Sequence, residues 1–195
     1  MGGWCWQHNA HLLRRMNTLP DLINDDTHLL SIGLNPSLPS VDAGFYFANP
    51  RNRFWTALNL SGVFPEPLEP SLDSCQHLVD RFHIGFTDLV KRPTAGCKDL
   101  KAADYREGSK RLDTMIEDVG AKAVWFHGKL TCQKYVQYSA NKNRSIVWGK
   151  QPWLLNNNPV FITPNPSPAN AAYSLKDISD SYQAMFQQLS LRPAC

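Results

Sequence analysis

Short apolar runs alternate along this chain with longer amphipathic stretches, and that alternation limits the fold more than any other feature. Four runs have the length and composition of buried strands, at 28–32, 84–87, 123–127 and 160–163. Helical spacing of apolar side chains marks the stretches between or after them, at 53–60, 74–82, 103–119 and 175–189. Strands that alternate with helices predict an α/β domain with a largely parallel sheet.

A length of 195 residues, of which 43% are hydrophobic, fits one compact domain with a real core. We expect residues 1–26 to form an N-terminal extension and residues 27–195 to form a single domain. No apolar run approaches the roughly 18 to 20 residues that a membrane-spanning helix needs. The first residues also lack the order of a secretory signal, so we expect a cytoplasmic protein that does not bind membranes.

The five cysteines are widely spaced and contain no CxxC pair. This spacing supports neither a disulfide framework nor a zinc or iron–sulfur site. The six histidines likewise show no paired spacing suited to zinc. We therefore expect no bound metal.

Charge is distributed unevenly, although the total is only +3. Residues 1–120 hold twelve basic and fifteen acidic side chains, whereas residues 121–195 hold eight basic and two acidic ones. Clustered Lys and Arg displace counterions from phosphates, so a polyanion such as nucleic acid is a plausible partner. A merely solvated cationic surface is the alternative.

Each predicted strand is followed by an unusual loop. These loops are GLNPSLPS at 33–40, DLVKRPT at 88–94, Gly128-Lys129, and PNPSPAN at 164–170. The carboxyl ends of parallel strands share one edge of the sheet, and ligands bind beyond that edge. This edge is the candidate functional site.

The first of these loops would hold an amide side chain in a fixed pose. Pro36 and Pro39 stiffen the loop around Asn35, and Gly33 permits close approach of the backbone. An Asn-Pro pair is also a common turn initiator, which is the alternative interpretation. A second Asn-Pro-Ser, at 165–167, favours a functional role because it repeats the same chemistry after the fourth strand.

Several segments resemble one known family, in the right order, from about Leu29 to Leu189. They are GLNPS at 33–37, GFYFANPRNRFW at 44–55, GFTDLVKRPT at 85–94 followed by KDL and REG, WGKQ at 148–151, and NPS at 165–167. Together they resemble the mismatch-specific uracil/thymine-DNA glycosylases (the Mug and thymine-DNA glycosylase family) of the uracil-DNA glycosylase superfamily. The PRNRFW and SPAN segments look more like the hypoxanthine-DNA glycosylase branch of that superfamily.

The resemblance implies a three-layer α/β/α sandwich around a short, mainly parallel, four-stranded sheet. It implies a monofunctional glycosylase of base excision repair that hydrolyses the N-glycosidic bond of a damaged or mispaired base, with uracil first and thymine or hypoxanthine as alternatives. The target nucleotide must be flipped out of the duplex before it reacts. The implied partner is double-stranded DNA, no cofactor is expected, and a monomer is the simplest form.

The same resemblance assigns roles to residues near the base. Asn35 would position the attacking water, and Phe47 would stack on the flipped base. Backbone N–H groups around Gly33 and Leu34, together with Asn165, would face the base. Without the motif, Phe47 would be interpreted as a core residue.

Other positions would contact the DNA backbone or the gap in the duplex. Asn52 and Arg53 lie where a helix would begin and could hold a phosphate, although a capping and surface role is equally plausible. The other expected DNA contacts are Lys129, Lys150, Ser167, Pro168, Ala169 and Asn170. The loop 165–170 departs from the family because it has no bulky or cationic plug, which leaves Asn170 as the expected probe of the duplex.

Asp88 is a second departure, since related enzymes often carry Lys or Asn there. An ionised carboxylate could accept a hydrogen bond from the N–H of uracil or hypoxanthine, or assist the water as a general base. A solvent-facing Asp that caps a turn is the alternative. His127 could line the same edge, although a satisfied histidine at a strand end is the favoured interpretation.

Two other functions stay open at this stage. One is a non-catalytic nucleic-acid-binding relative, against which Asn35 and Phe47 argue because binding alone needs no amide to position water. The other is a hydrolase or transferase for free nucleosides or nucleotides, against which the acid-free stretch 121–176 argues because a single phosphate would use only two or three of its charges.

Overall fold

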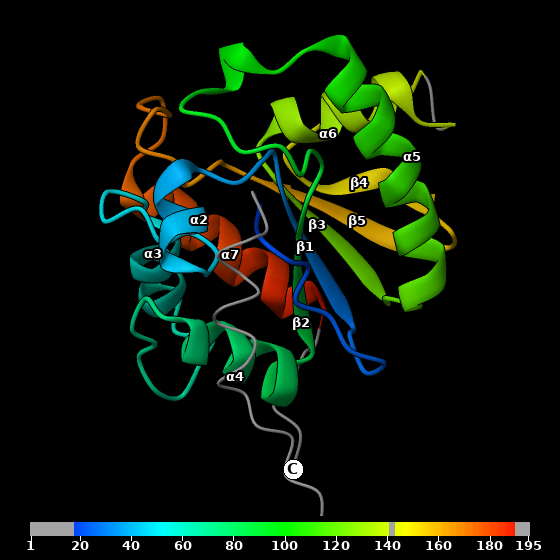
Figure 1. Ribbon diagram of the computed structural model, residues 1–195. Coiled ribbons are helices and arrows are strands. Elements are labelled where there is room, and N and C mark those ends of the chain that lie inside the picture. Colours follow the sequence, from blue (N-terminus) through cyan, green and yellow to red (C-terminus); the bar gives the residue numbers. More distant parts are fainter. Residues whose placement is uncertain (1–17, 141–142, 190–195) are drawn as a thin grey trace, which may run out of the picture.

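The computed structural model describes residues 18–140 and 143–189. Within them, a central sheet of five strands has the order β2-β1-β3-β5-β4 (Figure 1). The strands are β1 (Leu29–Gly33), β2 (Ile84–Asp88), β3 (Ala123–His127), β4 (Gly149–Leu155) and β5 (Asn158–Thr163). Four of them run parallel, and β4 pairs antiparallel with β5 at the edge.

Helices cover both faces of this sheet (Figure 1). The helical elements are α2 (Leu38–Ala43), α3 (Phe54–Leu60), α4 (Leu72–Phe82), the 3-10 turn η1 (Cys97–Asp99), α5 (Ala102–Val119), α6 (Lys129–Tyr138) and α7 (Leu175–Leu189). Helices α3, α4 and α7 pack on one face, and α5 and α6 pack on the other. The expected three-layer, mainly parallel α/β/α architecture is confirmed, but the sheet has five strands rather than four.

The two apolar clusters follow directly from the alternation of side chains along each strand. In β3, Trp125 packs with α3 and α7, while Val124 and Phe126 face α5 and α6. In β5, Phe161 packs in the same cluster as Trp125, and Ile162 packs in the cluster on the other face of the sheet. Strands buried on both faces are continuous apolar runs, which is why the sequence revealed them.

Three elements differ from the sequence-based expectation. Helix α2 forms inside the segment expected to be a loop, with Ser37 as its N-cap and Pro39 in its first turn. Helix α6 begins at Lys129. The loop expected after the third strand is therefore only one residue long, Gly128, which is the N-cap of this helix. Strand β4 was missed because its sequence does not alternate between apolar and polar residues. The polar Gln151 is buried, the apolar Leu154 is exposed, and Pro152 is uncommon inside a strand.

Residues 18–26 of the expected N-terminal extension lie against the domain, whereas 1–17 and 190–195 fall outside the described residues. Leu22 forms an antiparallel bridge with Phe86 in β2, with hydrogen bonds of 2.9 and 2.8 Å. Asp21 accepts hydrogen bonds from Thr87 Oγ1 at 2.6 Å and Lys91 Nζ at 2.9 Å. It also pairs with Arg111 at 3.0 Å. The segment therefore covers the free edge of β2 next to the candidate site.

Candidate functional site

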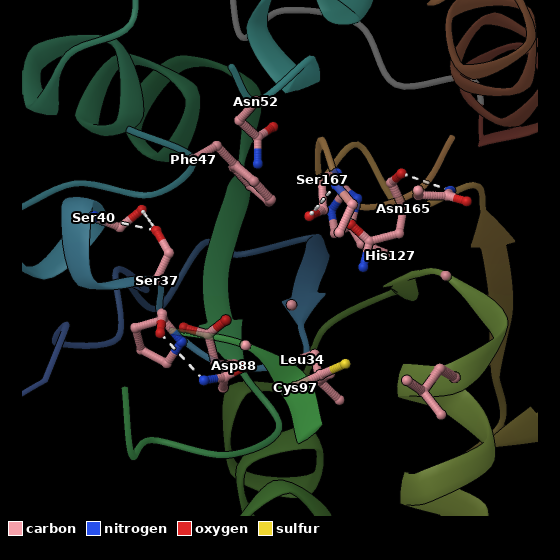
Figure 2. A pocket seen from close by; sticks show the side chains of 18 of the residues that line it. Leu34, Ser37, Ser40, Phe47, Asn52, Asp88, Cys97, His127, Asn165 and Ser167 are labelled. Carbon is pink, nitrogen blue, oxygen red and sulfur yellow. Dashed lines mark hydrogen bonds between the residues drawn. The ribbon is translucent and has the colours of Figure 1, made fainter. Parts of the chain in front are cut away.

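A cleft of about 510 Å3 opens where β1, β2, β3 and β5 end (Figure 2). Most residues singled out in the sequence line it, namely Gly33, Leu34, Asn35, Phe47, Asn52, Asp88, Lys129, Asn165, Ser167, Ala169 and Asn170. Arg53, Lys150 and Pro168 do not. Leu19, Ser37, Ser40, Thr94, Cys97, Trp148 and Tyr173 also line it, although the sequence assigned them no role, and so does His127, for which a place at this edge was the less favoured interpretation.

Asn35 is held by its amide nitrogen. Nδ2 donates to Thr94 Oγ1 at 2.8 Å and to the carbonyls of Pro36 and Arg92, both at 3.2 Å. Thr94 in turn donates to the Gly96 carbonyl at 3.0 Å. The amide oxygen accepts no hydrogen bond from the described residues, and Asn35 lines the cleft. This arrangement presents a fixed acceptor, which can orient a water molecule.

Asp88 ends β2 opposite Gly33 of β1 and lines the cleft (Figure 2). Its side chain is only 4% exposed, and Oδ2 has no hydrogen-bond partner among the described residues. Burial raises the pKa of Asp88 to about 7, and Asp21 adds to this, while Lys91 and Arg111 oppose it. A Cβ at position 33 would overlap Asp88 Oδ1, so only glycine lets β1 and this carboxyl lie together. The alternative of a solvent-facing Asp does not fit this burial.

Phe47 adopts a left-handed backbone conformation, with φ of 60°, that large side chains rarely occupy. Its ring stacks on Phe54, with centroids 3.9 Å apart and an interplanar angle of 14°. The same ring meets His127 edge-on at 5.0 Å. A backbone held in a costly conformation so that an aromatic ring faces a cleft suggests that the ring has a function there.

His127 is also in the cleft, which the favoured sequence interpretation did not expect. Its Nε2 lies 2.8 Å from Ser31 Oγ, but Nδ1 is buried without a partner among the described residues. Burial lowers the pKa of His127 to about 3, so the ring is neutral at pH 7. The sequence could have predicted this position, because His127 ends β3 at the edge of the sheet where the site was expected.

The loop after β5 is folded by its own side chains. Asn165 Oδ1 accepts a hydrogen bond from Ser167 N at 2.9 Å, and Asn170 Nδ2 donates to the Asn165 carbonyl at 2.9 Å. The backbone N–H of Asn170 donates to the Ser167 carbonyl at 3.0 Å. The tip of this compact turn carries only the small exposed side chains of Pro168 and Ala169.

Arg53 lies behind this loop and binds its backbone. The guanidinium donates to the carbonyls of Pro166 at 3.4 Å, Ser167 at 3.1 Å, Asn170 at 2.7 Å and Tyr173 at 2.5 Å. The expected contact of Arg53 with a phosphate would compete with these bonds. Asn52 precedes Arg53, the N-cap residue of α3, and its Oδ1 accepts a hydrogen bond from Phe54 N at 2.9 Å; Asn52 also lines the cleft.

Cationic and aromatic side chains meet at the rim. Lys129 Nζ lies 4.8 Å from the centroid of the Trp148 ring. Trp148 in turn meets Tyr173 at 5.1 Å between centroids, with an interplanar angle of 70°. Lys150 is exposed on β4 nearby. The sequence had offered Trp148 only as part of the WGKQ motif.

Among the described residues, no group of three or more His, Cys, Asp or Glu could hold a metal ion. No helix within that part of the chain is long and apolar enough to cross a membrane. The side chains described above bring together an amide, a buried carboxyl group, a neutral imidazole and an aromatic ring in one cleft.

Comparison with known proteins agrees with the fold. The model of the uracil DNA glycosylase superfamily matches residues 20–190. The fold is similar to the solution NMR structure of a Methanosarcina acetivorans protein described as a candidate uracil DNA glycosylase. The two share 18% sequence identity with a TM-score of 0.58, over 89% of this chain and 98% of that one.

Proposed function

Because the chain belongs to the uracil DNA glycosylase superfamily, we propose that it hydrolyses the N-glycosidic bond of a flipped-out uracil, or of another deaminated or mismatched base, in DNA. The product is an abasic site. The observation that carries the proposal is Asn35, a residue of the cleft whose amide nitrogen is fixed by three acceptors while its oxygen has no hydrogen-bond partner among the described residues.

In this mechanism the flipped base stacks on the face of Phe47 that Phe54 does not cover. Asn35 Oδ1 accepts a hydrogen bond from a water molecule and holds it near the anomeric carbon of the sugar. The C1′–N bond breaks, its electron pair leaves with the base, and the water oxygen bonds to C1′. The water gives up one proton, and the departing base is protonated. An amide is a poor base, so positioning and charge stabilisation provide the catalysis.

Asp88 is proposed to recognise the base. Its unpartnered oxygen is a hydrogen-bond acceptor when ionised, and uracil and hypoxanthine each offer an N–H at a suitable edge. This property keeps hypoxanthine as a second candidate substrate. The small tip of the 165–170 loop also favours weaker dependence on an opposite guanine than a mismatch-specific enzyme would show.

Excision can be tested with labelled duplexes that carry G:U, A:U or G:T, or hypoxanthine opposite each base. Alkaline cleavage after incubation reveals abasic sites. We expect cleavage at uracil or hypoxanthine. If no duplex or single strand is cleaved, although the protein still binds DNA, the chain is a non-catalytic relative.

A further inference from the structure

Trp148 is a large aromatic side chain that stays 40% exposed at the rim of the cleft. Its ring contacts Lys129 and Tyr173, as described above, and both of these also line the cleft. The proposed base site already contains its own aromatic partner in Phe47. An exposed tryptophan beside it, next to a cation, therefore calls for a separate explanation.

The backbone on both sides of Trp148 is fixed by hydrogen bonds from buried side chains. Gln151, which is 4% exposed, accepts from Val147 N at 3.1 Å and donates to the carbonyls of Val147 and Gly149 at 2.9 and 2.8 Å. Trp153 Nε1 donates to the Ser145 carbonyl at 2.7 Å. The buried glutamine of WGKQ thus fixes the turn that presents the tryptophan of the same motif.

The neighbouring loop lacks a side chain that could fill a gap in a duplex. Pro168 and Ala169 are exposed at its tip, and Asn170 is bound to Asn165. When a nucleotide leaves the stack, its neighbours and its former partner lose a stacking surface. A base that has lost its stacking partner in this way is stabilised by contact with an aromatic or apolar side chain.

We propose that Trp148, with Lys129 beside it, is a stacking subsite for a second nucleobase of the bound DNA, the one exposed when the target base is turned out. This inference rests on the proposed function. Every base has a π face, so stacking here tolerates sequence, and the ammonium group of Lys129 favours the adjoining phosphate. The base opposite the target and the bases on either side of it offer the same chemistry.

The test uses duplexes that contain a 2′-fluorinated deoxyuridine, which resists excision and keeps the complex intact. The fluorescent base 2-aminopurine is placed opposite the target, or on its 5′ or 3′ side, in three separate duplexes. Four proteins are compared: wild type, Trp148→Leu, Trp148→Phe and Leu154→Ala. Leu154 is a matched control because it is 47% exposed on β4 and does not line the cleft.

We expect Trp148→Leu to raise Kd about 10-fold, while Trp148→Phe and Leu154→Ala stay close to wild type. At one of the three positions, 2-aminopurine emission should be quenched by wild type and recover with Trp148→Leu, and that position identifies the stacked base. The subsite is refuted if Trp148→Leu binds like wild type, or if emission is the same for both proteins at all three positions. Excision by wild type on ordinary uracil or hypoxanthine duplexes is measured in parallel, so failure of the proposed function shows separately.

Discussion

The side chain of Asn35 combines two properties that a substitution can separate, a fixed amide nitrogen and a free oxygen. Asn35→Ala should lower the single-turnover excision rate by about 100-fold or more, because the water loses its position. Thr94→Val removes one of the three acceptors and should cost about tenfold. Gel-shift affinity for the uncleavable duplex should change little for either variant. Parallel loss of affinity and rate would mean that Asn35 is structural.

Asp88 makes stability depend on pH. Its pKa is 3.8 in a model peptide and about 7 in the folded protein. The folded state therefore binds the proton more tightly, and stability falls as the pH rises from about 4 to about 7. Between pH 4 and pH 8, the free energy of unfolding of wild type should fall by about 4 kcal/mol relative to Asp88→Asn. Urea denaturation at both pH values measures this difference.

The exposed Asp42→Asn provides the control for loss of one surface carboxylate. Activity gives an independent check on the same carboxyl group. If the carboxylate accepts an N–H from the base, excision by wild type should increase as the pH rises through about 7, and Asp88→Asn should remove that increase. Equal rates for the two proteins on both uracil and hypoxanthine would exclude a direct role.

At the scale of elements, Arg53 joins the start of α3 to the loop after β5. Arg53→Ala removes charged hydrogen bonds to four backbone carbonyls and should lower stability by about 3 kcal/mol. Amide hydrogen exchange over residues 166–173 should become faster. Arg51→Ala is the matched control, because Arg51 is exposed and donates only its backbone N–H to Asn49. Unchanged exchange in Arg53→Ala would show that the loop holds its own shape.

Sequence patterns revealed the elements whose apolar side chains form a continuous run or recur at a regular helical spacing. Strands β1, β2, β3 and β5 and helices α3, α4, α5 and α7 lie within a few residues of their predicted positions. Strand β4 buries a glutamine to hold a turn, so no apolar period marks it. The loops that follow the predicted strands contain most of the residues that line the cleft, so the sequence also predicted its place. The contacts of Arg53, Trp148 and His127 depend on distant segments, and no local pattern reports such contacts.

At the scale of the whole molecule, the basic half of the chain supplies β3, α6, β4 and β5. Lys129 lies at the carboxyl edge of the sheet, and Lys150 at the start of the antiparallel β4, whereas Lys122 precedes β3 at the opposite edge. The double variant Lys129→Ala/Lys150→Ala should reduce the slope of log K against log salt by about 2. Lys122→Ala should leave the slope unchanged. Equal slopes for all proteins would place the phosphates on another surface.

The position of the cleft also limits how this protein can survey DNA. The cleft opens at one edge of an asymmetric sheet, whereas the two strands of a duplex run in opposite directions. A protein bound in one orientation therefore presents its cleft to nucleotides of one strand. Sliding keeps that orientation, and a hop through solution allows the protein to turn around before it rebinds. Under the proposed function, a lesion in the complementary strand would be inspected only after dissociation, and frequent short hops would then serve the search better than long uninterrupted slides.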